Sequence, residues 1–302
     1  MKATQKILII VGPTSSGKSA LSVELAQKFN GEVISADSRQ VYRGLNIGTG
    51  KITEREKQGV PHHLLDVASP SKPFSADDFV HLAQAAIADI SSRDKFPIVT
   101  GGTGFYIDAL VGRIVLPNVP ANPALRARLG KKSAAQLFAM LKKRDPRRAQ
   151  TMSSPSERNN KVRLIRALEI IETLGSVPSA KDRPLYDALW VGVAPPMKKL
   201  EKKIATRLYE RIRQGMVAEA KRLHACGLSY KRMEELGLEY RSLASFLQGK
   251  ITRMQMIEEL KSAIRRYAKR QIMYWKRNKD IVWFEKPEMR KIPATVTAWL
   301  KK

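Results

Sequence analysis

The sequence is poor in cysteine, with Cys226 the only one among its 302 residues. A single cysteine cannot form an intramolecular disulfide or a cysteine-clustered zinc site, so neither kind of cross-link stabilises the fold. The chain also lacks any run of about 18 apolar residues, the length that a membrane-spanning helix requires. Its N-terminus leads directly into a short apolar segment, without the long apolar region of a signal peptide. We therefore expect a cytoplasmic protein with no membrane segment.

Acidic residues are scarce as well, because 28 Asp and Glu stand against 55 Lys and Arg, for a net charge of +27. The excess is uneven: the net charge is +2 in residues 1–115, +11 in residues 116–200 and +14 in residues 201–302. A positive field of this size attracts polyanions and gives a salt-dependent affinity for nucleic acid. Lysines that merely keep a protein soluble are the alternative. The uneven distribution favours a nucleic-acid partner.

Apolar segments alternate with helical patterns in the first third of the chain. Residues 7–11 are all apolar, and the helix that follows their Gly/Ser turn has Leu21, Leu25 and Phe29 on one face. Further elements are expected as strands at 32–36 and 97–100 and as a helix at about 76–92. Strand–helix alternation with short turns predicts a parallel α/β sheet, with catalytic loops beyond the carboxyl ends of its strands.

The pattern changes near residue 116, where LPNVPANP carries three prolines in a short span. Helical patterns follow, including a basic amphipathic stretch at about 157–173. Residues 189–196 resemble another core strand, and two longer helical stretches close the chain at 198–224 and 253–276. We therefore expect a catalytic core of residues 1–115 and 199–302, interrupted by a mainly helical insertion at 116–198.

A phosphate-binding motif lies between the first strand and the first helix. The pattern G-x-x-x-x-G-K-[ST] is matched by Gly12, Pro13, Thr14, Ser15, Ser16, Gly17, Lys18 and Ser19. Its backbone amides and the helix N-terminus bind phosphate oxygens, Lys18 adds a mobile positive charge, and the Ser19 hydroxyl is placed to ligate Mg²⁺. The motif predicts a P-loop NTPase-like fold with flanking helices, but many nucleotide-binding and ATP-binding enzymes share it.

Two further segments follow the expected strands. Asp37 should lie beside the phosphate loop, where a carboxylate can act as a general base, although a turn or N-cap aspartate is the alternative. The sequence Gly101-Gly102-Thr103-Gly104 stands where a motor ATPase would carry an acidic residue for its metal. It argues against a motor ATPase and favours close approach of a substrate to the backbone, unless it only forms a tight turn.

Basic side chains in the helical regions offer weaker signals. Arg163 and Arg166 lie three residues apart and share a helix face, which suits a phosphate backbone or, alternatively, a solvated surface. Arg207 lies in a basic helix where nothing local distinguishes it. His62 and His63 are adjacent and project differently, so they make a poor metal pair and we expect a structural role for them.

Together these motifs resemble the tRNA dimethylallyltransferase family of bacterial type, over about residues 7–282. The resemblance is carried, in order, by GPTSSGKS, SADSRQVYRGLNIGTGK, GVPHHLLDV, VTGGTGFYI and RLIRALEI. It implies transfer of a dimethylallyl group from dimethylallyl diphosphate to N6 of the adenosine 3′ to the anticodon, in tRNAs that read codons beginning with U. LGLEYRSL departs from the Gly-Tyr turn of many members, and the zinc finger of eukaryotic members is absent.

The resemblance also implies roles for particular residues. Gly12 to Ser19 would bind the donor diphosphate with Mg²⁺ at Ser19, Asp37 would take the proton from N6, and Lys18 and Arg207 would stabilise the departing diphosphate. The matching tRNA-contact positions are Asp37, Ser38, Arg39, Gln40, Thr103, Arg126, Val162, Arg163, Leu164, Ile165 and Arg166. The adenosine would leave its stack to enter the site. We expect a monomer whose partners are tRNA and dimethylallyl diphosphate.

Three alternatives compete with this hypothesis. An adenylate isopentenyltransferase would prenylate free AMP, ADP or ATP, but a mononucleotide gives no reason for the basic excess after residue 115. A small-molecule P-loop kinase would transfer the γ-phosphate of ATP and leaves VPHHLLD unexplained. An RNA-binding protein with a decayed P-loop would not be expected to retain Lys18, Ser19 and Asp37.

Overall fold

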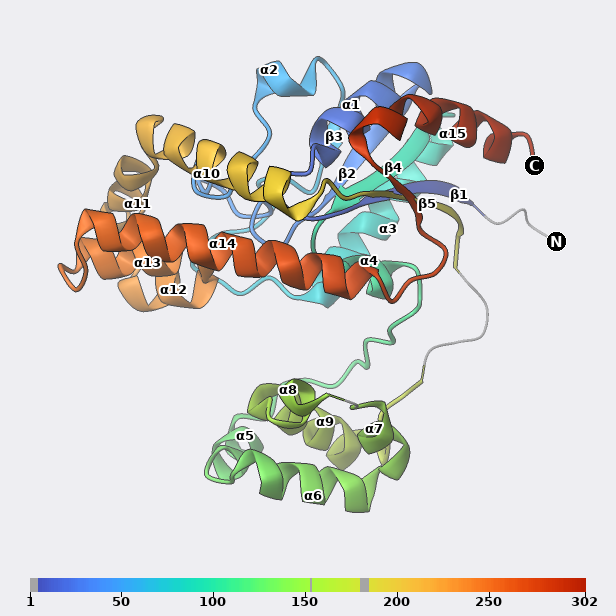
Figure 1. Ribbon diagram of the computed structural model, residues 1–302. Coiled ribbons are helices and arrows are strands. Elements are labelled where there is room, and N and C mark those ends of the chain that lie inside the picture. Colours follow the sequence, from blue (N-terminus) through green and yellow to red (C-terminus); the bar gives the residue numbers. More distant parts are fainter. Residues whose placement is uncertain (1–4, 153, 180–184) are drawn as a thin grey trace. The chain divides into compact units, whose positions relative to one another are not determined.

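Figure 1 shows a computed structural model of the chain, which describes residues 5–152, 154–179 and 185–302. The chain divides into two compact units, which we call the main unit (residues 1–111 and 184–302) and the insertion (residues 112–183). Strand β5 (Asp187–Val193) pairs with β1 and belongs to the sheet of the main unit. We had expected the insertion to extend to residue 198, but the chain has already returned to the sheet at residue 187.

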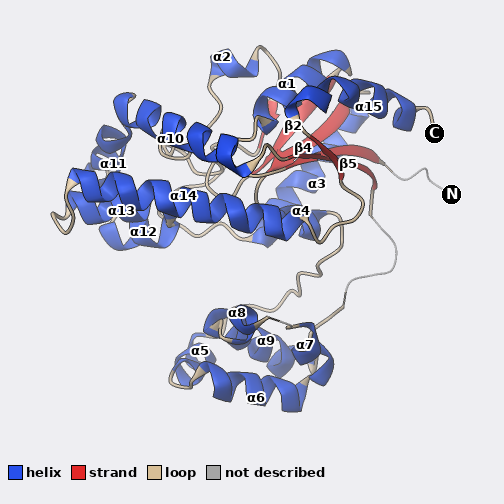
Figure 2. Cartoon of the chain, viewed as in Figure 1, coloured by secondary structure: helices blue, strands red, loops and turns tan. Residues whose placement is uncertain are grey.

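The main unit contains a six-stranded parallel sheet in the order β3-β2-β4-β1-β5-β6. Figure 2 shows the sheet surrounded by the helices of this unit. Its remaining strands are β1 (Lys6–Val11), β2 (Gly31–Ala36), β3 (His62–His63), β4 (Phe96–Gly101) and β6 (Val282–Phe284). The predicted parallel α/β sheet is confirmed, and the strands expected at 7–11, 32–36 and 97–100 are three adjacent strands of it, β1, β2 and β4.

Helices cover both faces of this sheet because its strands alternate buried side chains between the two faces. Leu8 and Ile10 of β1 pack with residues of α1 and α15, whereas Ile7 and Ile9 pack with residues of α3 and α4. These helices are α1 (Lys18–Lys28), α3 (Ala76–Ser92), α4 (Gly104–Leu110) and α15 (Ile292–Leu300). Two short helices complete this part of the unit, α2 (Glu54–Lys57) and the 3-10 helix η1 (Lys286–Lys291).

Five further helices pack around their own hydrophobic cluster, in which Tyr240 is 1% exposed. They are α10 (Met197–Arg213), α11 (Met216–Ala225), α12 (Tyr230–Leu236), α13 (Leu238–Leu247) and α14 (Arg253–Trp275). The stretch expected at 198–224 forms two helices because Gly215, at φ 100°, turns the chain between α10 and α11. The cluster also includes Val41 and Leu45, which tie the segment after β2 to these helices.

The insertion is helical and has its own hydrophobic core, to which Leu137, Leu141 and Leu164 contribute fully buried side chains. Its helices are α5 (Pro123–Gly130), α6 (Ala134–Arg144), α7 (Pro146–Thr151), α8 (Pro155–Arg158) and α9 (Lys161–Leu174). The helical stretch expected at about 157–173 is divided between α8 and α9, and Asn160 caps α9 by accepting the amide of Arg163 at 3.2 Å. No helix in the described part of the chain is long and apolar enough to span a bilayer.

Candidate active site

The turns after β1, β2 and β4 start at one level along the same edge of the sheet. Val11 and Ala36 both pair in register with Gly101, the last residue of β4. Ligands of parallel α/β proteins bind beyond the carboxyl ends of the strands. Residues of all three turns line one cavity of about 560 Å³, which also receives side chains from α10, α13 and α14.

The turn after β1 is the P-loop, and its backbone is shaped by two glycines with positive φ. At Gly12, φ is 150° and a Cβ atom would lie 2.2 Å from the carbonyl oxygen of Val193; at Gly17, φ is 103°. No described side chain caps the N-terminus of α1, whereas α3, α6 and α14 are capped by Ser75, Ser133 and Thr252. Because the first amides of a helix have no partner within it, those of α1 can bind an anion.

Lys18 turns back onto the loop that carries it, where its Nζ donates to the carbonyl oxygen of Pro13 at 2.7 Å. Burial lowers the pKa of Lys18 to about 8, while the Asp37 carboxylate raises it and the Arg207 guanidinium lowers it further. An anionic phosphate in the cavity would favour the charged form and draw the pKa back up. The Lys18 side chain thus lines the cavity, where its ammonium group could bind an anion.

Asp37 both closes its own turn and faces the cavity. Its Oδ1 accepts the backbone amides of Arg39 at 2.8 Å and Gln40 at 3.3 Å. Its Oδ2 accepts no hydrogen bond from the described residues, and Asp37 lines the same cavity as Lys18. The turn-aspartate alternative is thus correct for one oxygen, while the other can accept a proton from a bound substrate.

The turn after β4 is joined to the two others by side chains. Thr103 Oγ1 accepts the amide of Ser38 at 3.0 Å, which ties this turn to the one after β2. Gln271 of α14 accepts the amide of Thr14 at 2.8 Å and donates to the carbonyl oxygen of Gly102 at 3.0 Å. A Cβ atom on Gly102 would lie 2.0 Å from Gln271 Nε2, so the glycine allows this approach.

Our sequence reasoning missed Gln271, which is 5% exposed. The available signal was a polar side chain on the otherwise apolar face of α14, which Ile264, Ala268 and Trp275 form. A buried amide needs polar partners, so such a residue points to a nearby backbone that lacks them.

Arg207 of α10 lies over the P-loop, although nothing in its local sequence distinguished it. Its Nη1 is 3.5 Å from the Oγ of Ser15, and its side chain lines the cavity. Burial lowers the pKa of Arg207, and the neighbouring Arg211 lowers it further. Even so, an arginine stays charged in a protein, and Arg207 brings a second cation to the phosphate cradle.

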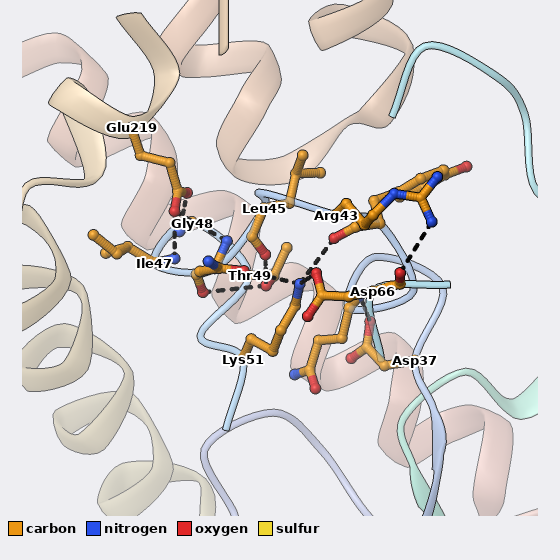
Figure 3. Close-up of polar contacts among 12 residues, drawn as sticks. Asp37, Arg43, Leu45, Ile47, Gly48, Thr49, Lys51, Asp66 and Glu219 are labelled. Atoms are coloured by element: carbon orange, nitrogen blue, oxygen red, sulfur yellow. Dashed lines mark hydrogen bonds and ion pairs between the residues drawn. The ribbon is translucent and has the colours of Figure 1, made fainter. Parts of the chain in front are cut away.

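The loop at residues 45–51 is held by a buried carboxylate, as Figure 3 shows. Glu219 of α11 is 2% exposed and accepts three backbone amides, from Asn46 at 3.0 Å, Ile47 at 2.8 Å and Gly48 at 2.8 Å. The Tyr240 hydroxyl donates to the same carboxylate at 2.8 Å. A Cβ atom on Gly48 would lie 2.6 Å from the Tyr240 oxygen, which explains the glycine. Our sequence reasoning singled out neither Glu219 nor this role of Tyr240.

Lys51 fixes the far end of this loop (Figure 3). Its Nζ donates to the carbonyl oxygen of Tyr42 at 2.8 Å, to Asn46 Oδ1 at 2.9 Å and to Asp66 at 2.5 Å. Burial lowers the pKa of Lys51, and the Asp66 carboxylate opposes this. The loop contributes Thr49 and Gly50 to the cavity wall. Two of the segments that carry the family resemblance, SADSRQVYRGLNIGTGK and GVPHHLLDV, therefore meet at the Lys51–Asp66 pair.

The expected RNA-contact residues form two sets, one in each unit. In the insertion, Arg126 makes a bidentate pair with Glu169, at 2.9 Å from Nε to Oε1 and 2.8 Å from Nη2 to Oε2. Arg166 also bonds Glu169 and donates to the carbonyl oxygen of Val119 at 2.8 Å. Arg163 is more open and lies 3.6 Å from Glu157.

Leu164 requires a correction, because its side chain is fully buried in the core of the insertion. Helix periodicity explains this, since Leu164, Leu168 and Ile171 recur on the apolar face of α9. Its side chain cannot contact RNA. Val162, by contrast, is 78% exposed, and Ile165 is half-buried.

A P-loop fold whose phosphate cradle shares a cavity with a carboxylate defines a class: an enzyme that acts at a phosphorylated substrate. Lys18, Arg207, the first residues of α1 and the carboxylate of Asp37 all line that cavity. The chain belongs to the IPP transferase family, which it matches over residues 40–279.

Curated relatives and solved structures agree with this family. A tRNA dimethylallyltransferase 2 of Citrifermentans bemidjiense is 44% identical over 265 residues, which cover 88% of this chain and 84% of the relative. A tRNA dimethylallyltransferase of Leuconostoc citreum is 39% identical over 98% of this chain and 99% of its own length. The tRNA isopentenylpyrophosphate transferase of Bacillus halodurans superimposes with a TM-score of 0.74 at 35% identity, covering 98% of this chain and 97% of that one. A eukaryotic dimethylallyltransferase acting on tRNA gives a TM-score of 0.79 at 27% identity, over 98% and 78% of the two chains.

Proposed function

We propose that this protein is a tRNA dimethylallyltransferase, which moves a dimethylallyl group from its diphosphate to N6 of the adenosine 3′ to the anticodon. The tRNAs would be those that read codons beginning with U. The observation that carries the proposal is that the P-loop and the Asp37 carboxylate line one cavity. The cradle suits the diphosphate of the donor, and the carboxylate suits the amino group of the acceptor.

The reaction forms a bond between N6 of adenine and C1 of the prenyl group and breaks the bond from C1 to the diphosphate oxygen. The electron pair of the broken bond leaves with the diphosphate. Asp37 Oδ2 takes the proton that N6 loses, which helps because an adenine amino group is a poor nucleophile. The α1 amides, Lys18 and Arg207 stabilise the negative charge that grows on the diphosphate.

The residues present fit a Mg²⁺ ion bound together with the diphosphate. The cavity is lined by two buried hydroxyl oxygens, Ser16 Oγ and Thr100 Oγ1, that have no hydrogen-bond partner among the described residues. The same residues include no group of three His, Cys, Asp or Glu side chains that could hold a metal ion. Mg²⁺ commonly binds through substrate phosphates, water and few protein oxygens, and the Ser19 hydroxyl would be one of these. When bound, the ion neutralises charge on the leaving diphosphate.

A tRNA acceptor, rather than a free adenine nucleotide, is supported by the charge of the chain. Residues 116–302 carry a net charge of +25. Binding a mononucleotide does not require so large a positive charge, whereas binding a polyanion such as tRNA benefits from it. We assign the tRNA contacts to Asp37, Ser38, Arg39, Gln40 and Thr103 in the main unit and to Arg126, Val162, Arg163, Ile165 and Arg166 in the insertion. We further propose that the protein acts as a monomer in the cytoplasm, where its acceptor is found.

The proposal is tested by comparing acceptors with labelled dimethylallyl diphosphate and Mg²⁺. Unmodified tRNA should take up label, whereas AMP, ADP and ATP should not. Label on the free nucleotides alone would identify an adenylate isopentenyltransferase. Transfer of the γ-phosphate from ATP, with no prenyl transfer, would identify a kinase.

A further inference from the structure

The wall of the candidate cavity is polar except on the side that α13 and α14 form. Most of its lining residues are glycines or carry charged or polar side chains. The large apolar or aromatic side chains in the wall come from these two helices, and they are Leu238, Ile264 and Tyr267. A ligand made only of charged and hydrogen-bonding groups would need no such side chains. The donor of the proposed reaction has a diphosphate at one end and an apolar chain at the other.

Leu238 differs from Ile264 in how it packs within the protein. Ile264 is 3% exposed and belongs to the hydrophobic cluster of α10 to α14. Leu238 is half-buried and belongs to none of the hydrophobic clusters that the described residues form. Burial of apolar surface is favourable, so a leucine that lines a cavity without joining a core has surface that a ligand can cover.

The backbone places Leu238 in the cavity wall in an unusual conformation. Its φ is 39°, in the left-handed region that side chains rarely adopt, and it follows Gly237 at 73°. The residues after it are fixed, because Glu239 accepts a hydrogen bond from Arg211 at 3.1 Å and Tyr240 is 1% exposed. Strain of this kind persists where the surrounding structure enforces it, and it is common at ligand sites.

The residue before Leu238 faces the segment that carries the proposed base. A Cβ atom on Gly237 would lie 3.9 Å from Nη2 of Arg39. Arg39 follows Asp37 by two residues and donates its amide to the Asp37 carboxylate at 2.8 Å. One side of the turn at Leu238 is therefore directed to the acceptor end of the cavity.

The residue after Leu238 leads to the donor end. Glu239 is bonded to Arg211, and a Cβ atom on Gly50 would lie 3.7 Å from Cδ of Arg211 and 3.0 Å from Nη2 of Arg207. The two arginines thus flank one glycine, and Arg207 lies over the P-loop. Leu238 therefore lies between the proposed base and the diphosphate cradle. The chain attached to C1 of the donor belongs in this part of the cavity, because C1 is bonded first to the diphosphate and then to N6.

We propose that Leu238 is a specificity-determining residue, which contacts the prenyl chain of the donor and excludes longer chains. The inference deepens the proposed function, on which it rests for the identity of the donor. The segment LGLEYRSL, which contains Leu238, departs from the Gly-Tyr turn of many family members, so the resemblance assigns this residue no role. Leu238 forms the apolar side of the cavity together with Ile264 and Tyr267, and a longer chain would meet its side chain.

The experiment compares dimethylallyl diphosphate with the longer geranyl diphosphate as donors for the wild-type protein and for Leu238→Ala. The substitution removes contacts with the short chain and makes room for the long one. We expect kcat/KM to fall about tenfold for dimethylallyl diphosphate and to rise about tenfold for geranyl diphosphate, as is usual for such a change in an apolar pocket. Leu238→Met, which keeps the volume, should retain the wild-type preference. The matched control is Leu174→Ala, at a leucine of α9 that is 49% exposed, and it should do the same.

Binding without an acceptor separates the chain contact from catalysis. In calorimetric titrations with Mg²⁺, Leu238→Ala should weaken binding of dimethylallyl diphosphate about tenfold, the same pocket effect. It should leave binding of inorganic diphosphate unchanged, because that ligand has no chain. Leu238→Gly also removes the side chain but accepts a left-handed backbone without strain. It should give the same two results, with a thermal midpoint no lower than that of Leu238→Ala.

Two outcomes would overturn the inference. One is a wild-type preference between the two donors in both Leu238→Ala and Leu238→Gly. The other is a raised KM for tRNA with unchanged donor affinities, which would assign Leu238 to the acceptor. A wild-type protein that transfers no prenyl group would refute the proposed function, whereas a selective loss of dimethylallyl diphosphate binding in the two variants would still support the chain contact. A wild-type protein that does not bind dimethylallyl diphosphate would refute both.

Discussion

The two edges of the central sheet differ in what surrounds the buried polar groups of their strands and turns. At the amino edge, Glu32 of β2 is 2% exposed, receives Arg93 at 2.6 and 2.9 Å and contacts His63 at 2.7 Å. At the carboxyl edge, Ser16 Oγ and Thr100 Oγ1 are buried without a partner among the described residues. Buried polar atoms are normally hydrogen-bonded, and because Ser16 and Thr100 line the candidate cavity, a bound ligand can supply the missing partners. The amino edge serves stability, and the carboxyl edge serves chemistry.

The largest effect that would separate the two edges is expected from Asp37→Asn. The amide oxygen can still accept the amides of Arg39 and Gln40, so the turn should survive, but the side chain can no longer take a proton. We expect kcat for prenyl transfer to fall by about 10²–10⁴-fold, the usual contribution of a general base. The thermal midpoint should stay within the error of the wild type. Turnover at the wild-type rate would show that Asp37 is not the base.

The converse change at the amino edge is Glu32→Gln. Hydrogen bonds from Arg93 lower the pKa of Glu32 from 4.5 to about 2, against the effect of burial and with help from His63. Because folding lowers the pKa, the ionised Glu32 carboxylate stabilises the folded state by about 3 kcal/mol. This stabilisation is complete above about pH 4.5 and is lost as the pH falls towards 2. Chemical denaturation at pH 7 should show a loss of this order, with kcat unchanged. If Glu32→Gln instead caused a large loss of turnover without a loss of stability, the claim that the amino edge serves stability would be wrong.

Glu219 should behave as an intermediate case, because it lies at the carboxyl edge but is fully bonded. Glu219→Gln replaces one acceptor oxygen with a donor that faces a backbone amide, which should cost about 2 kcal/mol of unfolding free energy. Turnover should fall too, since the loop that Glu219 holds supplies Thr49 and Gly50 to the cavity. Denaturation and steady-state kinetics on one preparation measure both. If Glu219→Gln lowered the unfolding free energy but left turnover unchanged, Glu219 would have a purely structural role, as we expect for Glu32.

The smallest expected effect concerns the pH dependence of donor binding. Lys18 has a lowered pKa of about 8 in the free protein, and a bound diphosphate raises it. Affinity for dimethylallyl diphosphate should therefore be constant below about pH 8 and weaken above it, by up to about tenfold per pH unit. Calorimetric titrations from pH 7 to 9.5 would measure this. Lys18→Arg should remove the fall, since an arginine stays charged; a wild-type profile that is flat to pH 9.5 contradicts the assignment.

Most of the candidate site at the carboxyl edge could be predicted from the sequence, because each of its turns is a short segment that directly follows a strand. The P-loop, Asp37 and the Gly101–Gly104 turn each follow an apolar strand, and parallel strands place such turns together. The partners of Gln271 and Glu219 were not predictable, because they are backbone groups more than 160 positions away in the chain. Leu164 was assigned to RNA binding by resemblance to a family segment, whereas its helical period with Leu168 already predicted burial.

The most direct test of the account is mass spectrometry of unmodified tRNA after incubation with the protein, Mg²⁺ and dimethylallyl diphosphate. Nuclease fragments should show one prenyl group in place of one hydrogen, on the adenosine 3′ to the anticodon, with none in a parallel Asp37→Asn reaction. An unmodified anticodon loop in the wild-type reaction, with the donor intact, would contradict the claim that the cradle and the carboxylate serve one transfer.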